Sequence, residues 1–333
     1  MASTGIGGPK SQHVGRILLR AAVTLLMVAS LNFILFRIIP GDPAALLLGG
    51  ARASVTAEQM EAQRQNWGLD RPLFPDQVVD YLSASLHGDF GYSFKFRGRH
   101  VSDLILERLP ATVALVGLAQ FIAILCGVML GLYAGWRRGG AVDHIVTGAS
   151  LALYSTPSFW LGMLLVVIFS TALGWLPGYG AYSPGGISGS LDWLIDYLRH
   201  LVLPVTAVAL GLIGQYVVVA RAAMSDVVTE DYMVTARAKG LNGGQMLMRH
   251  AFRNAMLPVV TLITLNLGYV VAGAITVEAV FAWPGIGGLT VEALNARDYP
   301  VLQGIFLLLG ASIVVANLVT DLAYGILDPR VRQ

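Results

Sequence analysis

Residues 231–258 read DYMVTARAKGLNGGQMLMRHAFRNAMLP and form a polar segment between two long apolar runs. Basic residues gather around Gly240, with Lys239 before it and Arg249 and Arg253 after it. Each flanking run is close to the ~20 helical residues that cross the hydrocarbon core of a membrane. The segment therefore predicts a chain that crosses a membrane more than once and presents a basic loop to a partner at the membrane surface.

The composition also indicates a membrane protein. Of the 333 residues, 55% are hydrophobic and only 13% are charged, whereas about a quarter of the residues of a soluble domain are charged. The net charge of +2 is too small to indicate a nucleic-acid-binding protein. The single cysteine, Cys126, excludes a disulfide framework within the chain. Its apolar surroundings predict a buried thiol that acts as a small hydrophobic group.

Six apolar segments predict transmembrane helices, because a helix satisfies its own backbone hydrogen bonds in lipid. They cover residues 14–36, 111–135, 145–173, 201–220, 256–277 and 301–322. The first segment lacks a small-residue cleavage site after it, so we interpret it as an uncleaved span, with a signal peptide as the alternative. The expected fold class is an all-α polytopic membrane protein with six transmembrane helices.

The basic residues of the short connections predict the orientation of the chain. Lys and Arg are concentrated before the first segment, between the second and third, between the fourth and fifth, and after the sixth. Cytoplasmic connections carry such an excess. Both termini and the polar segment 231–258 are therefore expected on the cytoplasmic side of the cytoplasmic (inner) cell membrane.

The polar loop is expected to fold as two short helices. Residues 226–239 have acids early and bases late, which complements a helix dipole, and Gly240 stands where a left-handed C-terminal cap is needed. A second helix that begins near Gln245 has an apolar stripe with a basic stripe beside it. The apolar stripe is Met248, Phe252 and Met256, and the basic stripe is Arg249 and Arg253. This arrangement suits a protein partner, and a basic helix on anionic lipid headgroups is the alternative.

The loop resembles the membrane subunits of ATP-binding-cassette importers, and more narrowly the first permease subunit of the dipeptide/oligopeptide class. The positions that match the peptide-permease pattern are Asp231, Tyr232, 235–240, 249–251, 253–255, Leu257 and Pro258. The general importer signature matches only at Ala236 and Gly240. Other landmarks of the class occur in the same order along the chain. They are the segments 40–43, 68–72, 88–93, 108–112, 284–287, 297–300 and 328–330.

The resemblance implies a permease subunit that moves short peptides by alternating access, with energy from partner chains. In this family the loop docks on a cytosolic ATPase. The residues thereby implied in coupling are Asp231, Tyr232, Thr235, Ala236, Arg237, Lys239, Gly240, Arg249 and Arg253. The chain lacks the Gly-x-x-x-x-Gly-Lys-Ser/Thr run of a phosphate-binding loop, so ATP and Mg are expected on the partner. It is expected to be a non-catalytic subunit with no cofactor of its own.

The implied partners are a homologous second permease, two cytosolic ATP-binding-cassette subunits or domains, and an extracytoplasmic solute-binding protein. Peptide substrate and the lipid bilayer complete the set, and no nucleic acid is expected. The domain layout is then a flexible tail (1–13), a first transmembrane helix (14–36), an extracytoplasmic lid domain (37–106), a core permease domain of five transmembrane helices (107–325) containing the cytoplasmic coupling loop (223–255), and a second tail (326–333). Within the lid, Thr56 and Gln59 predict a capping box and residues 78–86 a short helix. A purely structural insertion is the alternative to a lid.

Two groups of residues are candidates for the transport route. Polar side chains inside apolar segments mark function by default, and the alternative is that they hold helices together. They are Gln120, Gln215, Asn266 and Asn317. The last outer connection breaks its helix with a proline and glycines, and such backbone lines a pathway or forms a simple re-entrant turn. Its outer-gate candidates are Trp283, Pro284, Gly285 and Asp298.

Three alternatives stand beside the peptide importer. An ion-coupled secondary transporter is expected to have carboxylates at mid-membrane, and the second to fifth segments contain none. An intramembrane enzyme needs paired catalytic or metal-binding side chains, and His144 and His250 have no second ligand at a suitable spacing. Within the importer class, nickel complexes, glutathione or haem are the alternative cargo.

Overall fold

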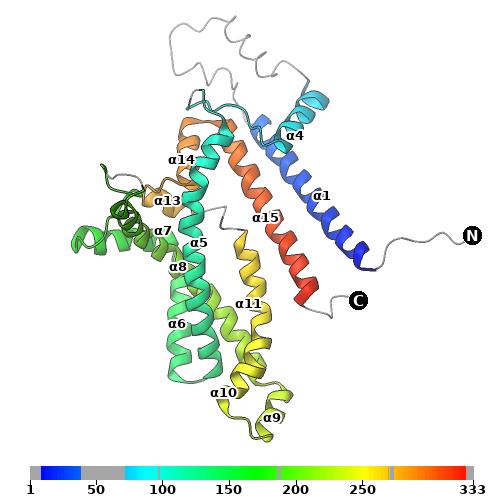
Figure 1. Cartoon of the computed structure of the whole chain (residues 1–333), viewed down its shortest axis with the longest axis vertical. Coiled ribbons are helices and arrows are strands. Elements are labelled where there is room, and N and C mark those ends of the chain that lie inside the picture. Colours follow the sequence, from blue (N-terminus) through cyan, green and yellow to red (C-terminus); the bar gives the residue numbers. More distant parts are fainter. Residues whose placement is uncertain are drawn as a thin grey trace, which may run out of the picture. The chain divides into compact units, whose positions relative to one another are not determined.

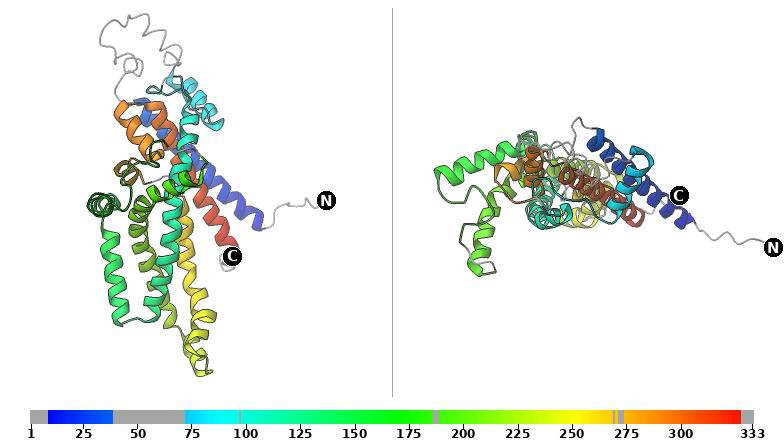
Figure 2. Two further views of the ribbon diagram at one scale, coloured as in Figure 1. Left: turned by 60° about the vertical axis from the view of Figure 1, so that its left-hand side comes forward. Right: turned by 90° about the horizontal axis from the view of Figure 1, so that it is seen from above.

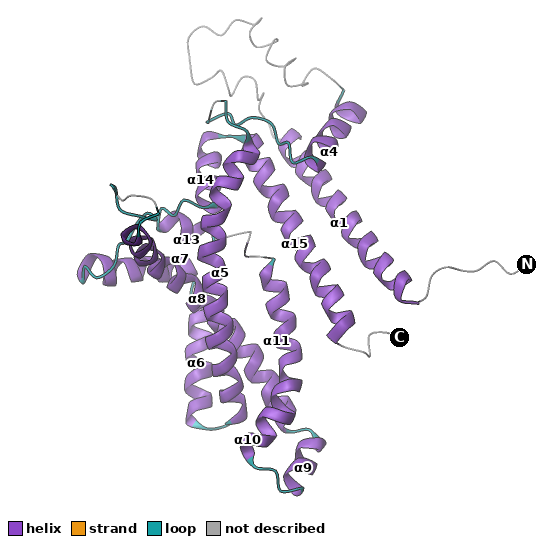
Figure 3. Ribbon diagram, in the orientation of Figure 1, coloured by secondary structure: helices purple, strands orange, loops and turns teal. Residues whose placement is uncertain are grey.

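The structure is a computed structural model, and it describes most of the chain. The described residues are 9–38, 72–96, 98–185, 189–268, 270 and 274–327. They form helices joined by loops, with no strand among them and one isolated bridge between Tyr92 and His100 (Figure 3). The chain divides into two compact units. Unit 1 is Met1–Arg108, Leu289–Leu318 and Arg332, and unit 2 is Leu109–Gly288, Val319–Val331 and Gln333.

Unit 1 is built around two long apolar helices (Figure 1). Its elements are α1 (Pro9–Ile38), the π-helical segment η1 (Leu73–Gln77), α4 (Val78–Leu86), and parts of α5 (Val101–Trp136), α14 (Ile286–Ala296) and α15 (Tyr299–Leu327). Helices α1 and α15 pack closely, because a Cβ at Gly310 would overlap the side chain of Val28. The amide of Asn32 also donates to the Gln303 carbonyl at 3.1 Å.

Unit 2 holds the larger hydrophobic core. Its elements are the rest of α5, α6 (Ala141–Ser155), α7 (Ser158–Leu165), η2 (Val166–Ala172), α8 (Leu191–Val228), α9 (Asp231–Ala238), α10 (Gly243–Met246), η3 (Leu247–Ala251), α11 (Phe252–Leu267) and α13 (Ile275–Val280). Glycines let α5 approach α8, since a Cβ at Gly131 would lie 2.6 Å from the Val217 carbonyl oxygen. One buried cluster surrounds Trp283, and the other surrounds Tyr216 and Met224.

Four of the six predicted segments coincide with single helices that are long and apolar enough to cross a membrane, and a fifth, 145–173, coincides with a bent pair of helices that reaches this length only if the pair is one span. Four are single helices, at Gly15–Phe36, Val101–Trp136, Leu191–Val228 and Tyr299–Asp321. The fifth is a bent pair, Ala141–Ser155 and Ser158–Ala172, whose halves meet at 98°. The bend lies at Pro157, which lacks an amide hydrogen and keeps the residue before it out of the helical region.

The remaining predicted segment, 256–277, is not one continuous helix among the described residues. Helix α11 ends at Leu267, Gly268 is a turn residue, and α13 covers Ile275–Val280. The proposed count of six transmembrane helices is therefore not confirmed. Glycine at position 268 has low helical propensity, which is consistent with an end at this point.

Two local predictions were wrong. Residues 226–239 do not form one helix, because α8 runs to Val228 and α9 begins only at Asp231. The Thr229 hydroxyl donates back to the Asp226 carbonyl, and Glu230 is extended, so the backbone turns between the two helices. Cys126 is exposed rather than buried. Its neighbour Gly127 faces α8, and successive helical residues point in directions about 100° apart.

Several sequence features of the N-terminal and C-terminal regions lie outside the described residues. They include the motif at 40–43, the capping box of Thr56 and Gln59, Gly68, and the motif at 328–330. The short helix expected at residues 78–86 is confirmed, since α4 has these bounds. The domain layout as a whole stays a prediction.

Candidate functional site

The predicted two-helix loop is present at one end of unit 2 (Figures 1 and 2). Helix α9 ends at Ala238, and Gly240 follows with a φ of +78°, the left-handed conformation expected of it. Asn242 then caps α10. Its side-chain oxygen accepts from the backbone N–H of Gln245 at 2.9 Å, and its own backbone N–H donates to the side-chain oxygen of Gln245. The second helix thus begins at Gly243, close to the expected position.

We call residues 231–253, from α9 through α10 and η3 to the first residues of α11, the α9–α10 segment. It has one buried face and one exposed face. Met233, Ala236 and Met246 pack into the cluster that contains Tyr216 and Met224. On the other face, Val234 and Met248 are each 64% exposed, and Tyr232 and Phe252 are each 38% exposed. Of the nine residues predicted for coupling, Ala236 is buried and the other eight are exposed. Large apolar side chains among exposed arginines are typical of a protein interface.

Three of the four predicted pathway residues meet in unit 2, around a tyrosine that the sequence analysis missed. The Tyr216 hydroxyl accepts from Gln120 of α5, and from Asn266 of α11 at 3.1 Å. Asn266 also donates to the Gln215 side chain at 3.3 Å. Gln120 and Tyr216 are buried, while Gln215 and Asn266 are partly exposed. We call these four residues the amide–tyrosine cluster.

The burial of Gln120 and Tyr216 favours a helix-packing role for that part of the cluster, because a buried amide does not reach a passing solute. Tyr216 stands next to Gln215 in an apolar run, and this was the signal that could have identified it. The fourth predicted residue, Asn317, is exposed on α15 in unit 1 and is not part of the cluster.

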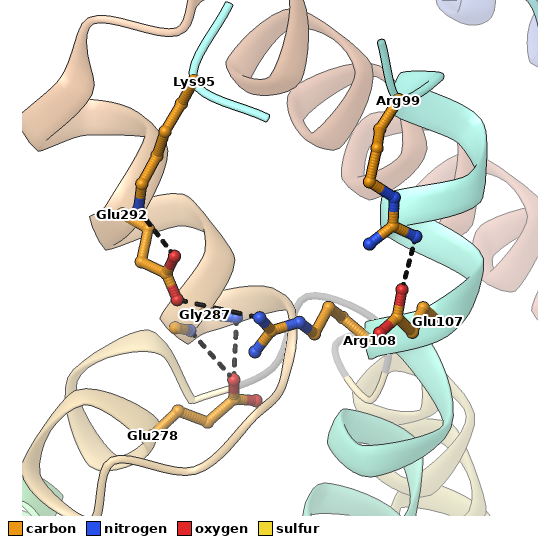
Figure 4. A network of polar contacts seen from close by, with 8 residues as sticks. Lys95, Arg99, Glu107, Arg108, Glu278, Gly287 and Glu292 are labelled. Atoms are coloured by element: carbon orange, nitrogen blue, oxygen red, sulfur yellow. Dashed lines mark hydrogen bonds and ion pairs between the residues drawn. The ribbon is translucent and has the colours of Figure 1, made fainter. Parts of the chain in front are cut away.

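The predicted helix break near Pro284 contains a buried carboxylate. Glu278 of α13 is fully buried and accepts from the Thr112 hydroxyl at 2.8 Å and from Gly288 N at 3.2 Å. It also accepts from Gly287 N at 2.8 Å (Figure 4). A carboxylate at the first turn of a helix, here α14, is favoured by the helix dipole. Burial raises the pKa of the Glu278 carboxyl, and these three hydrogen bonds oppose that rise. We call residues 278–288 with Thr112 the Glu278 turn.

The other predicted residues of this turn lie against the same carboxylate or in the core. A Cβ at Gly285 would overlap both Glu278 and Thr112, so only glycine fits there. Trp283 is 1% exposed and donates its indole N–H to the Ala111 carbonyl at 2.9 Å. Pro284, which lies between Trp283 and Gly285 in the sequence, is partly buried. Ala282, before Trp283 and Pro284, has a φ of +48°, a conformation that non-glycine residues rarely adopt.

The last outer-gate candidate, Asp298, belongs to unit 1. It is fully buried and accepts from the Ser93 hydroxyl at 2.5 Å and from Lys95 N at 2.9 Å. The Lys95 ammonium pairs with Glu292 at 2.7 Å, and Arg108 lies 3.9 Å from the same carboxylate (Figure 4). Asp298 thus ties the segment around Ser93 to the turn before α15. Within the described residues, no group of three His, Cys, Asp or Glu side chains is placed to hold a metal ion.

Comparison with known families covers nearly the whole chain. Residues 127–333 match the family described as "Binding-protein-dependent transport system inner membrane component". Residues 12–116 match the N-terminal domain described for the membrane components of the same transport systems.

Individual relatives agree with the family match. The di/tripeptide transport system permease protein DppB of Pseudomonas aeruginosa is 38% identical, and the match covers 93% of this chain and 95% of that protein. A Sinorhizobium fredii protein named "Probable peptide ABC transporter permease protein" is also 38% identical, over 96% of this chain and 99% of that protein.

A solved structure shares the fold. It is the inward-facing MetNI methionine ABC transporter, with a TM-score of 0.54 over 68% of this chain and 96% of that chain. The sequence identity is 16%, so this likeness concerns the fold alone.

Proposed function

Because the chain belongs to the family of binding-protein-dependent transport system inner membrane components, as an ABC importer permease of the peptide class, we propose that it moves short peptides across the cytoplasmic membrane, driven by ATP hydrolysis in partner chains. The chain itself is a non-catalytic translocation subunit. The names of its relatives support di- and tripeptides as cargo over nickel complexes, glutathione or haem.

One observation supports the coupling role above all others, namely the exposed face of the α9–α10 segment. Eight of nine coupling residues are exposed there, beside Val234 and Met248, which are each 64% exposed, and Tyr232 and Phe252, which are each 38% exposed. A buried face holds the segment on the helical core through Met233 and Met246. A partner that binds the exposed face can therefore move the helices behind it.

In the proposed mechanism, two cytosolic ATPases bind ATP and Mg and close on each other, and this closure is passed to the membrane helices through the α9–α10 segment. The helices then alternate between inward-facing and outward-facing states. A homologous second permease completes the pathway, and an extracytoplasmic binding protein delivers the peptide. In unit 2, the partly exposed amides of Gln215 and Asn266 are the pathway groups that remain able to meet a peptide backbone, and in unit 1 the exposed Asn317 is a separate candidate.

The proposed topology has six membrane-crossing helices, with α11 in the fifth, and both termini in the cytoplasm. The lid of residues 37–106 then lies outside, together with the Glu278 turn and Asp298. In this arrangement the outer-gate role falls to Trp283, Pro284, Gly285 and Asp298. The basic α9–α10 segment lies inside, as the excess of Lys and Arg in cytoplasmic connections predicts.

Affinity purification of the tagged chain from its native membrane in mild detergent, read by mass spectrometry, tests the proposed complex. We expect one homologous permease and a cassette ATPase to be recovered with the chain. A variant with Val234→Glu and Met248→Glu places two charges on the exposed face, and we expect it to lose about tenfold or more of the ATPase while retaining the second permease.

The matched control is Leu86→Glu, which places a charge on another exposed apolar side chain, in α4 of unit 1. It should retain the ATPase. Recovery of the chain alone, or as a homo-oligomer, in detergents that preserve known complexes would contradict the proposal. Equal loss of ATPase in the variant and in the control would remove the assignment of the interface to the α9–α10 segment.

A further inference from the structure

A bidentate ion pair joins α6 to α8 in unit 2. Arg221 donates from Nε to Asp143 Oδ1 and from Nη2 to Asp143 Oδ2, both at 2.8 Å. The Asp143 side chain is only 2% exposed, and that of Arg221 is 36% exposed. Two parallel hydrogen bonds between a guanidinium and a carboxylate fix the orientation of both groups, not only their distance.

The same carboxylate also fixes the turn between α5 and α6. Asp143 Oδ2 accepts from Gly139 N at 2.9 Å, and Asp143 Oδ1 accepts from the Thr147 hydroxyl at 3.3 Å. Gly139 has a φ of +78°, so the turn depends on a residue that adopts the left-handed conformation. The buried Asp143 side chain therefore accepts hydrogen bonds both from the α5–α6 turn and from Arg221 of α8.

Helix α5 contacts α8 at the same level. A Cβ at Gly135 would lie 2.5 Å from the Arg221 carbonyl oxygen and 2.8 Å from Met224 Cβ, so the two backbones approach without a side chain between them. Arg138, in the turn, donates to the Ser225 carbonyl at 3.3 Å. The α5–α6 hairpin is thus attached to the C-terminal part of α8 by the ion pair, by close backbone packing and by this further hydrogen bond.

This part of α8 leads directly into the proposed coupling segment. Arg221 lies about two helical turns before the end of α8 at Val228, and α9 begins at Asp231. The buried face of the segment rests on the same stretch of α8, because Met233 and Met246 share a cluster with Met224. The turn between α5 and α6 and the α9–α10 segment lie at the same end of unit 2 in Figure 1 and in the left view of Figure 2.

We propose that Asp143 is a positioning residue that, through Arg221, locks the C-terminal part of α8 to the α5–α6 hairpin, so that movement of the α9–α10 segment displaces three helices as one body. The proposal rests on the proposed function. Without the Asp143–Arg221 ion pair, the C-terminal end of α8 moves separately from the α5–α6 hairpin when the ATPases displace the α9–α10 segment. ATP is then hydrolysed without the helices behind α8 being moved.

The first test measures peptide transported per ATP hydrolysed in the complex reconstituted in proteoliposomes. We expect Asp143→Asn and Arg221→Gln each to lower this ratio about fivefold or more while the amount of assembled complex is unchanged. The double variant should be no worse than the more affected single variant, because both substitutions remove one shared interaction. Arg221→Lys keeps the charge but not the two-bond geometry, so its ratio should lie between those of wild type and Arg221→Gln.

The matched control is an exposed charge at the same end of unit 2. Arg137→Gln removes a base in the α5–α6 turn that forms no ion pair among the described residues. It should leave the ratio at the wild-type value. If the Asp143 and Arg221 variants lose transport only in proportion to lost complex, with the ratio unchanged, Asp143 has a purely structural role and the proposal is overturned.

A second readout does not depend on transport. Spin labels at His144→Cys and Glu230→Cys, both exposed positions, in a Cys126→Ser background report the distance between α6 and the start of α9 in the complex in lipid nanodiscs. We expect one narrow distance distribution with Asp143 present and a distribution at least twice as wide with Asp143→Asn. An equally narrow distribution in the variant overturns the lock. If the wild-type complex shows no ATP-driven uptake, the proposed function fails, and this distance measurement still decides on the lock.

Discussion

The α9–α10 segment and the Glu278 turn belong to the same unit, but the turn buries its polar and aromatic side chains whereas the segment exposes large apolar ones. In the Glu278 turn, a carboxylate is fully buried with three donors from the same chain, and Trp283 is 1% exposed. In the α9–α10 segment, Val234 and Met248 are each 64% exposed, with exposed arginines around them. The buried carboxylate of the Glu278 turn finds its hydrogen-bond donors within the same chain, whereas the α9–α10 segment exposes apolar surface that a partner can cover.

This difference indicates where substitutions in each region should act. Loss of a buried donor or acceptor leaves its former partners unsatisfied, which lowers the stability of the fold. Loss of an exposed apolar side chain on an interface changes association and leaves the fold intact. If a substitution in either region changed fold stability and partner association together, this division between the two regions would be weakened.

The largest effect is expected for Gly240→Pro. Gly240 has a φ of +78°, whereas proline fixes φ near −65°, and its N–H donates to the Arg237 carbonyl at 3.0 Å, a bond that proline removes. A misfit of ~3 kcal/mol corresponds to about a 100-fold loss in a coupling equilibrium. We expect ATP-driven uptake and transport-coupled ATPase activity to be lost while the chain still inserts in the membrane.

The control at this position is Gly240→Asn. No atom lies within 4 Å of a Cβ built on Gly240, so the backbone conformation alone decides which residue fits. Asparagine tolerates the left-handed conformation better than other side chains, and it should retain most of the uptake. Normal uptake by Gly240→Pro would remove the coupling role from this turn.

Glu278→Ala should have the next largest effect, and on stability instead of coupling. It leaves the Thr112 hydroxyl and the amides of Gly287 and Gly288 without their acceptor in a buried site. We expect a loss of ~3 kcal/mol or more, measured as a lower denaturation midpoint of the purified complex. Glu278→Gln retains one acceptor oxygen and should lose less. An unchanged midpoint for Glu278→Ala would show that the turn is not held by this carboxylate.

Phe252→Ala should weaken association without affecting the fold. Phe252 is 38% exposed on the α9–α10 face, and an aromatic side chain at an interface contributes ~1–2 kcal/mol, or about tenfold in affinity for the ATPase. The matched control is Phe121→Ala, an exposed phenylalanine within α5. Titration of the ATPase onto the complex in nanodiscs measures both. A drop in thermal stability with unchanged affinity for Phe252→Ala would contradict the division between the two regions.

The smallest effect is expected in the amide–tyrosine cluster. Tyr216→Phe removes the hydroxyl that accepts from Gln120 and Asn266, and hydrogen bonds between membrane helices contribute ~0.6 kcal/mol on average. A loss of about 1 kcal/mol in stability is expected, and a double-mutant cycle with Asn266→Ala measures the shared part. A several-fold change in peptide preference at unchanged stability would instead assign the cluster to the transport route.

The sequence predicted what depends on local patterns. Apolar length identified four single helices and one bent pair, and Gly240 identified the end of the first loop helix in the left-handed conformation. These features follow from neighbouring residues, because membrane crossing requires a continuous apolar segment and a helix end requires a particular backbone conformation.

Contacts between residues far apart in the chain could not be predicted in this way. Thr112 and Glu278 are 166 positions apart, and Asp143 and Arg221 are 78 positions apart, so no local pattern links them. Tyr216 was missed for the same reason, since its role depends on where α5 and α11 meet α8. The exposure of Cys126 also depends on which face of α5 packs against α8.

Uptake of a labelled tripeptide by proteoliposomes that contain this chain, its second permease, the ATPases and the binding protein tests the central claim most directly. The account predicts uptake that requires ATP on the ATPase side, persists when an uncoupler collapses the ion gradient, and is lost with Gly240→Pro but not with Gly240→Asn. Uptake that continues without ATP and collapses with the uncoupler would contradict the account and assign the chain to an ion-coupled transporter.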